Sequence, residues 1–250
     1  MRLAALVTLA FFVLCQLAFA AEPSPKPTTD DEAKLMLKQS YHLWNENKLS
    51  EAISLLEAVV SYNPKFEAEF PEERSHLRAR SMLGHVYKSA GQWEKSLSAF
   101  DLAEEYAQER GSYEPTMLPY GMSDCREKLA EQGKAPADPL IVVGGWVYRG
   151  GKTMQDGSPL VSASDIAPKL GLTVSPASPE SIVFTSKGKK PKSLKVTIGS
   201  KTASGSGKTV RLSVAPRKVD DTVFVPLRAV SEFFGGKVKW DAASKVAWIE

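Results

Sequence analysis

Few residues in this chain could do chemistry, and their spacing matches none of the common catalytic sets. General acid–base or nucleophilic catalysis needs a histidine beside a nucleophile, or paired carboxylates that face one another. Adjacent acidic residues such as Glu72 and Glu73 point to different faces of a helix, and the patterns G-x-S-x-G, H-E-x-x-H and C-x-x-C do not occur. We therefore expect no catalytic, cofactor-binding or metal-binding residues and a protein that is not an enzyme. The alternative is an enzyme whose site carries no motif.

The stretch Ser204–Thr209, SGSGKT, has the composition of a phosphate-binding loop but not its spacing. That loop requires a glycine five residues before Gly207, where Thr202 stands. The residues that follow, 210–214, alternate like a strand and do not open a helix. Nucleotide binding is not expected.

Charge divides the chain into two parts. Residues 30–134 hold 13 Lys+Arg against 19 Asp+Glu, net −6, whereas residues 135–250 hold 17 against 9, net +8. A basic part can attract an anionic wall polymer, lipid head groups, nucleic acid or the acidic part itself, or it can be a solvated surface. Its densest cluster is a loop that lacks aromatic residues for base stacking, so we expect no nucleic acid. The candidate polymer-binding residues are Lys187, Lys189, Lys190 and Lys192.

The first twenty residues have the pattern of a secretory signal peptide. Arg2 precedes an apolar run, and Ala18-Phe19-Ala20 forms a small-residue cleavage site before Ala21. The run is too short to span a bilayer, so we expect cleavage, an extracytoplasmic protein that is secreted or bound to the envelope, and no transmembrane segment in the mature chain. The alternative is a bacterial lipoprotein anchored at Cys15, which the Leu14 before it disfavours.

Cleavage leaves one cysteine, Cys125, in the mature chain, so no intramolecular disulfide can form. Cys125 falls in a helical pattern that runs from Met122 to Glu131. A small buried thiol is the favoured interpretation, and a reactive or intermolecular cysteine is the alternative.

The acidic part predicts two pairs of amphipathic helices. The segment Thr29-Asp30-Asp31-Glu32 should cap the first helix, Ser50 should cap the second, and Gly91 should lie in the turn of the second pair. The predicted helices are residues 34–45, 50–62, 78–90 and 92–108, with a further capping helix at 122–132.

These pairs resemble the tetratricopeptide repeat. In the second pair the matching residues are Leu83, Gly84, Tyr87, Gly91, Trp93, Leu97, Phe100 and Ala103. The first pair is a looser match, with Asn47 in place of the turn glycine. The pairs are 44 residues apart, against the usual 34, so residues 65–76 hold about ten extra residues.

The resemblance implies a scaffold that docks peptides or proteins in a groove lined by the first helix of each pair. The aromatic and cationic residues of that groove are typical of binding hot spots. The alternative is that Tyr41 and Trp44 cover the linker or the second domain. The candidate partner-binding residues are Lys34, Tyr41, Trp44, Arg78, His85 and Lys88.

The basic part contains an internal repeat offset by 64 residues. Residues 158–174 align with 222–238, so that Val161 matches Val225 and Gly171 matches Gly235. In the second copy the pattern predicts a strand, a short helix stopped by Gly235-Gly236, and a hairpin. A duplicated strand–helix–strand–strand unit would form one α+β domain of about 110 residues.

The residues VFVPLRAVSEFFGGKVKWDAASKVAWI resemble the copper amine oxidase N-terminal-like domain, also called a stalk domain, which is common in exported bacterial proteins. The resemblance covers about 140–250. It does not imply copper, because a copper site needs several imidazoles and no histidine follows His85.

We therefore expect a multidomain protein with an all-α, tetratricopeptide-like repeat followed by an internally duplicated α+β stalk-like domain. Its expected function is a non-catalytic scaffold of the bacterial cell envelope that docks an envelope protein or peptide through the helical repeats. The alternative is a module that binds a cell-wall polymer or polysaccharide through the basic domain. The expected segments are a signal peptide (1–20), a Pro-rich linker (21–29), helical repeats (30–133), a linker (134–139) and the stalk-like domain (140–250).

Overall fold

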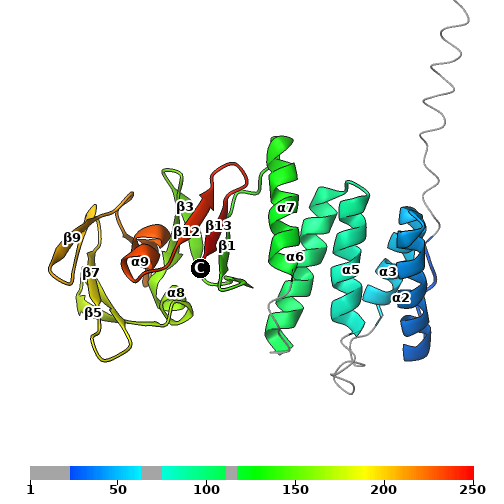
Figure 1. Cartoon of the computed structure of the whole chain (residues 1–250), viewed down its shortest axis with the longest axis horizontal. Coiled ribbons are helices and arrows are strands. Elements are labelled where there is room, and N and C mark those ends of the chain that lie inside the picture. Colours follow the sequence, from blue (N-terminus) through cyan, green and yellow to red (C-terminus); the bar gives the residue numbers. More distant parts are fainter. Residues whose placement is uncertain (1–22, 63–74, 111–116) are drawn as a thin grey trace, which may run out of the picture. The chain divides into compact units, whose positions relative to one another are not determined.

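A computed structural model describes residues 23–62, 75–110 and 117–250 of the chain (Figure 1). They divide into two compact units, residues 1–92 and residues 93–250. The predicted signal peptide, Cys15 and residues 65–74 of the predicted insertion lie outside the described residues. The broad prediction of a helical part followed by a β-rich domain is confirmed.

The first unit contains helices α2 (Asp30–Asn45), α3 (Leu49–Val60) and α5 (Ser75–Ser89). The predicted capping segment does cap α2, but the helix begins at Asp30 and not at the predicted Lys34; the Thr29 hydroxyl accepts a hydrogen bond from the Glu32 N–H at 3.2 Å. The Glu32 carboxylate accepts one in turn from the Thr28 N–H at 2.7 Å, so two N–H groups at the helix start are satisfied. The prediction that Ser50 caps α3 is wrong: α3 begins one residue earlier, after Lys48, and has no side-chain cap.

Small and branched side chains pack α3 against both α2 and α5. Ala52, Leu56, Ala79 and Val86 are completely buried. The turn from α2 to α3 places Asn47 at φ +59°, a left-handed conformation that Asn tolerates better than most residues do. Asn47 therefore fills the role that a glycine was expected to have.

The second unit begins with helices α6 (Trp93–Arg110) and α7 (Leu118–Glu131), which pack closely together. A Cβ atom on Gly121 would lie 2.7 Å from the Phe100 ring, so this approach requires glycine. Cys125 is completely buried, as predicted, and its thiol donates a hydrogen bond to Ser96 Oγ at 3.1 Å.

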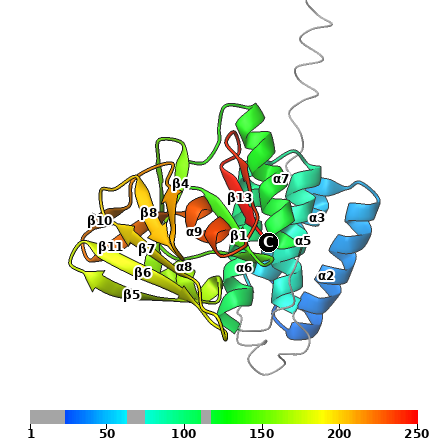
Figure 2. The same ribbon diagram turned by 60° about the vertical axis from the view of Figure 1, so that its left-hand side comes forward.

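Three sheets follow in the second unit (Figures 1 and 2). Sheet A has the order β12-β13-β1-β2, sheet B has β10-β11-β4-β3, and sheet C has β5-β6-β7-β8-β9. The strands are β1 (Leu140–Val143), β2 (Trp146–Val147), β3 (Lys152–Gln155), β4 (Ser158–Ser162), β5 (Leu172–Ser178), β6 (Ser181–Ser186), β7 (Ser193–Thr197), β8 (Thr202–Gly205), β9 (Lys208–Arg211), β10 (Arg217–Val219), β11 (Thr222–Pro226), β12 (Val238–Asp241) and β13 (Val246–Ile249).

Two short helices, α8 (Ala163–Lys169) and α9 (Leu227–Phe233), pack among these sheets. Figures 1 and 2 both show α9 between strands of sheets A and C. The shared core buries Ile166 of α8, Leu227 of α9 and Phe184 of β6 completely. The predicted strand, short helix and hairpin at the C-terminus are present, and Gly235 at φ +102° follows the end of α9.

The two segments aligned in the sequence both run strand, helix, strand, strand. Their first strands pair antiparallel, and Val161 lies opposite Val225, the residue with which it aligns. Their hairpins diverge, since β5 and β6 join sheet C whereas β12 and β13 join sheet A. Strand β1 then pairs parallel with β13, with Leu140 opposite Val246.

Side chains of helix α6 supply hydrogen-bond partners for the backbone N–H and carbonyl groups of the edge strand β2. The Val147 N–H donates to Glu104 Oε1 at 3.1 Å, and Gln108 Nε2 donates to the Val147 carbonyl at 2.7 Å. Gln108 also donates to Glu104 at 2.9 Å, and Glu104 is completely buried. These bonds explain why the second compact unit starts at Trp93, whereas the sequence pattern places α6 and α7 with the preceding helices.

We predict that Glu104→Leu lowers the melting temperature of the second unit sharply. It leaves the buried Val147 N–H without its acceptor, and an unsatisfied buried donor costs about 1–3 kcal/mol. Glu104→Gln should cost much less, because an amide oxygen still accepts. Calorimetric melting and amide hydrogen exchange at Val147 check this. Equal melting temperatures for the two variants would contradict the proposed role of the carboxylate.

Candidate partner-binding surfaces

Three of the predicted residues form one aromatic surface, defined here as Tyr41, Trp44 and His85. Tyr41 and Trp44 lie three residues apart on α2 and so share a helix face. The Trp44 and His85 rings are stacked, with centroids 6.1 Å apart and planes 19° apart, and Tyr41 meets Trp44 edge-on at 6.4 Å. The Tyr41 side chain is 52% exposed, so the surface is accessible within the first unit.

Hydrogen bonds fix the orientation of the aromatic surface. Trp44 Nε1 donates to Ser89 Oγ at 3.1 Å, and Ser89 Oγ donates to the His85 carbonyl, also at 3.1 Å. The indole is therefore tied to the same helix that carries His85. A rigid aromatic surface loses little conformational entropy when a partner binds.

The other three predicted residues flank the aromatic surface. Lys34 precedes Tyr41 by seven residues and Arg78 precedes His85 by seven, which places each about 10 Å along its helix on nearly the same face. Lys88 follows His85 by one turn. The structure thus gathers the rings into one cluster and leaves the cations spread along α2 and α5.

Tyr87, two residues after His85 on α5, is buried and forms a hydrogen bond with a neighbouring helix. The Tyr87 hydroxyl donates to the Glu57 carboxylate and so joins α5 to α3. Burial, followed by this carboxylate, raises the pKa of Tyr87 above its ordinary value, so the phenol stays protonated and remains a donor.

The candidate polymer-binding lysines form a second surface, the lysine hairpin, which joins β6 to β7. Its loop is closed by Ser186, whose N–H donates to the Lys192 carbonyl at 3.0 Å and whose hydroxyl accepts from the Lys192 N–H at 2.9 Å. Within the described part of the chain none of its lysines forms an ion pair. All four are exposed: Lys187, Lys189, Lys190 and Lys192.

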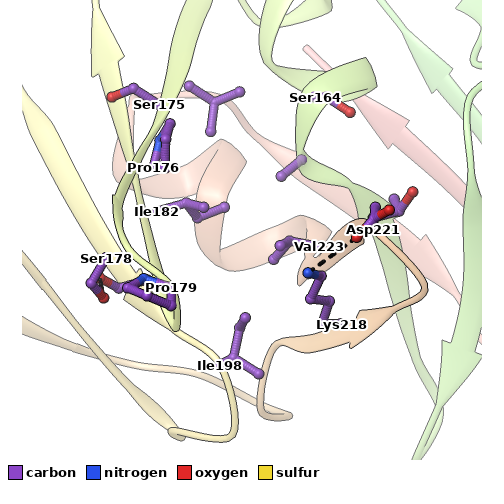
Figure 3. Close-up of a pocket in the computed structure, with 14 residues that line it drawn as sticks. Ser164, Ser175, Pro176, Ser178, Pro179, Ile182, Ile198, Lys218, Asp221 and Val223 are labelled. Atoms are coloured by element: carbon purple, nitrogen blue, oxygen red, sulfur yellow. Dashed lines mark hydrogen bonds and ion pairs between the residues drawn. The ribbon is translucent and has the colours of Figure 1, made fainter.

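A pocket of about 340 Å³ lies between α8, the β5–β6 hairpin and the β10–β11 turn (Figure 3). Hydroxyl groups line it beside the aliphatic Ile182, Ile198 and Val223, and an ion pair between Lys218 and Asp221 at 3.3 Å lies on one side. Asp221 is fully exposed, so this pair adds little stability. No local sequence pattern marks the pocket, because its lining comes from four separate segments. The hydroxyl residues are Ser164, Ser175, Ser178, Ser181 and Thr222.

The stretch Ser204–Thr209 is a hairpin turn and not a phosphate loop. Ser206 and Gly207 have φ values of +46° and +79° between β8 and β9, as in a two-residue turn of type I′. In residues 23–62, 75–110 and 117–250, no three His, Cys, Asp or Glu side chains gather as a metal site would need. No helix among those residues is long and apolar enough to cross a membrane.

One comparison with known proteins gave a match. Residues 151–249 match the family of the copper amine oxidase N-terminal domain, which supports the predicted stalk-like domain. In that oxidase the N-terminal domain is non-catalytic. The matched residues contain no histidine and so do not fit a copper site. No curated protein and no solved structure matched the chain.

We predict that Tyr41 contributes to recognition and not to folding. Tyr41→Ala should lower the free energy of unfolding by less than about 1 kcal/mol, because the side chain is exposed. Leu56→Ala, at a completely buried position, should cost about 2–5 kcal/mol. Urea titrations followed by circular dichroism check this. A cost above about 2 kcal/mol for Tyr41→Ala would favour the alternative in which the ring covers another part of the chain.

Proposed function

We propose that the protein is an exported, non-catalytic scaffold of the bacterial cell envelope that docks a protein or peptide partner through its aromatic surface. The observation that carries this proposal is the stacked and hydrogen-bonded arrangement of Trp44 and His85 beside the exposed Tyr41. Rigid, exposed aromatic side chains are the usual anchors of protein interfaces.

A tetratricopeptide-like architecture for the helices supports a docking role. Asn47 and Gly91 follow the first helix of each predicted pair and both have a left-handed backbone, with φ values of +59° and +68°. In repeats of this kind the first helices line the groove, and α2 and α5 are the helices that carry the aromatic surface.

The placement in the envelope rests on the sequence and on the stalk-like domain. Residues 1–20 have the charge, apolar run and cleavage site of a signal peptide. The match over 151–249 supports the predicted stalk-like domain, which resembles a domain common in exported bacterial proteins. We propose that this domain arose by duplication, because Val161 and Val225 align in the sequence and also pair across β4 and β11.

The docking proposal is tested by site-specific photo-crosslinking. A photoreactive phenylalanine analogue at position 41 should crosslink an envelope protein or peptide from the source cell, whereas the same analogue at Leu35 should not. Leu35 is an equally exposed apolar residue, and its position on α2 is half a turn round the helix from Trp44.

The crosslinked partner is then purified and its dissociation constant is measured. Trp44→Ala should weaken binding by at least about tenfold, as expected for a hot-spot aromatic residue, and Leu35→Ala should leave it unchanged. Equal crosslinking from positions 35 and 41, or unchanged affinity in Trp44→Ala, would overturn the proposal.

The lysine hairpin favours a second function, binding of an anionic wall polymer. Its four exposed lysines add positive charge without ion pairs in the described residues, and the hydroxyl-lined pocket is a candidate for contacts with sugars. Because the charges face solvent, salt should screen the attraction strongly.

For this second function we predict co-sedimentation with purified cell wall at about 0.05 M salt and release at about 1 M salt, where the screening length falls to about 3 Å. Changing Lys187, Lys189, Lys190 and Lys192 to Glu should abolish sedimentation. Charge reversal at Lys34, Arg78 and Lys88 serves as the control and should change it little. Salt-insensitive sedimentation would argue against the polymer.

A further inference from the structure

A cleft of about 510 Å³ lies within the second unit, where α6 and α7 meet the strands that follow them. One part of its lining is apolar, with Leu97, Met122, Leu129 and Val147. The other part is charged. Its cationic residues are Arg126, Lys134, Arg149 and Lys152, and its acidic residues are Glu94, Asp101 and Asp138.

Two of the four cations are neutralised by ion pairs. Lys134 pairs with Glu94 at 2.9 Å, and Arg149 pairs with Asp101 at 2.8 Å. Within the described residues neither Arg126 nor Lys152 forms an ion pair. The two cations without an ion pair are the most buried of the four, and Asp138 is the one acidic residue of the lining left to balance them, so the cleft keeps a net charge of +1.

The Arg126 guanidinium is held by backbone carbonyls and not by a carboxylate. Arg126 is 6% exposed, and its Nε donates to the Ser244 carbonyl at 3.0 Å. Its Nη2 donates to the carbonyl of Asp138, while the Asp138 residue itself is exposed. Burial lowers the pKa of Arg126 to about 10, which leaves it charged at neutral pH. Carbonyl dipoles fix its direction but supply no counter-charge.

The Lys152 ammonium is also short of a counter-charge. Lys152 is half-buried, and its Nζ donates to the Tyr148 carbonyl at 3.3 Å. Burial lowers the pKa of Lys152, and Arg149 and Arg126 lower it further, against the opposing influence of Asp101 and Asp138. A buried cation is costly unless an anion accompanies it.

We propose that this cleft binds a small organic anion, with a carboxylate or phosphate group between Lys152 and Arg126 and a short apolar body against Leu97 and Met122. The volume lies within the usual range of ligand sites, about 300–1,000 Å³. The site lies on the second unit and does not depend on the aromatic surface.

The test is isothermal titration of the full-length protein with hexanoate, hexyl phosphate and neutral hexanol at constant ionic strength. These probes share one apolar chain and differ in the head group. We expect the better anion to bind with a dissociation constant of about 1 mM or tighter, and hexanol to bind at least about tenfold more weakly, because charge-assisted hydrogen bonds are lost. The tighter of the two anions identifies the head group as carboxylate or phosphate.

Lys152→Met keeps the length of the side chain and removes the charge. It should weaken anion binding by at least about tenfold, while its melting temperature without ligand should stay equal or rise, because a buried unpaired charge has been removed. The control is Lys169→Met, which changes an exposed lysine and should alter neither quantity.

Other outcomes overturn the proposal. They are the absence of binding by both anions, equal binding of hexanol and the anions, and unchanged anion affinity in Lys152→Met. A marked fall in the melting temperature of unliganded Lys152→Met also overturns it, since that result would show that Lys152 is already compensated within the fold.

Discussion

The second unit depends on one constraint: a backbone N–H that leaves water must find an acceptor. Strand β2 is only two residues long and lies at the edge of sheet A. Helix α6 meets the constraint with side chains, since Glu104 accepts from Val147 and Gln108 donates to the Val147 carbonyl. A helix thus takes the place of a further strand, and the same bonds that protect the edge fix α6, against which α7 packs, to the sheet.

That packing also decides where the cleft charges lie. Arg126 belongs to α7 and Lys152 to β3, and both line one cavity in the unit where α6 is hydrogen-bonded to β2. Arg126 itself contributes to the attachment through the carbonyls of Ser244 and Asp138. The attachment of the helices and the charge imbalance of the cleft are therefore two results of one arrangement.

Local patterns predicted several features that depend on neighbours in the sequence, although the cap expected at Ser50 is absent. The cap at Thr29, the burial of Cys125 and the C-terminal strand, helix and hairpin all follow from periodicity and turn residues. The pattern could not show that Leu140 pairs with Val246, or that Glu104 accepts from Val147, because no local rule links residues so far apart. Tyr41 and Trp44 were found because the resemblance to tetratricopeptide repeats places them on a groove-lining helix, whereas Arg126 and Lys152 come together only in the fold.

The packing brings an acidic stretch and a basic stretch of the sequence into one compact unit. Residues 93–134 hold 5 Lys+Arg against 9 Asp+Glu, net −4, and they lie in one unit with residues 135–250, net +8. The Arg149–Asp101 pair joins the two stretches, so part of the basic charge is used within the fold. The lysine hairpin keeps its charge, because its four exposed lysines have no ion pair in the described part of the chain. The net charge of the domain therefore overstates its attraction for a polymer, and the hairpin gathers four of the exposed lysines that remain for an external partner in one loop.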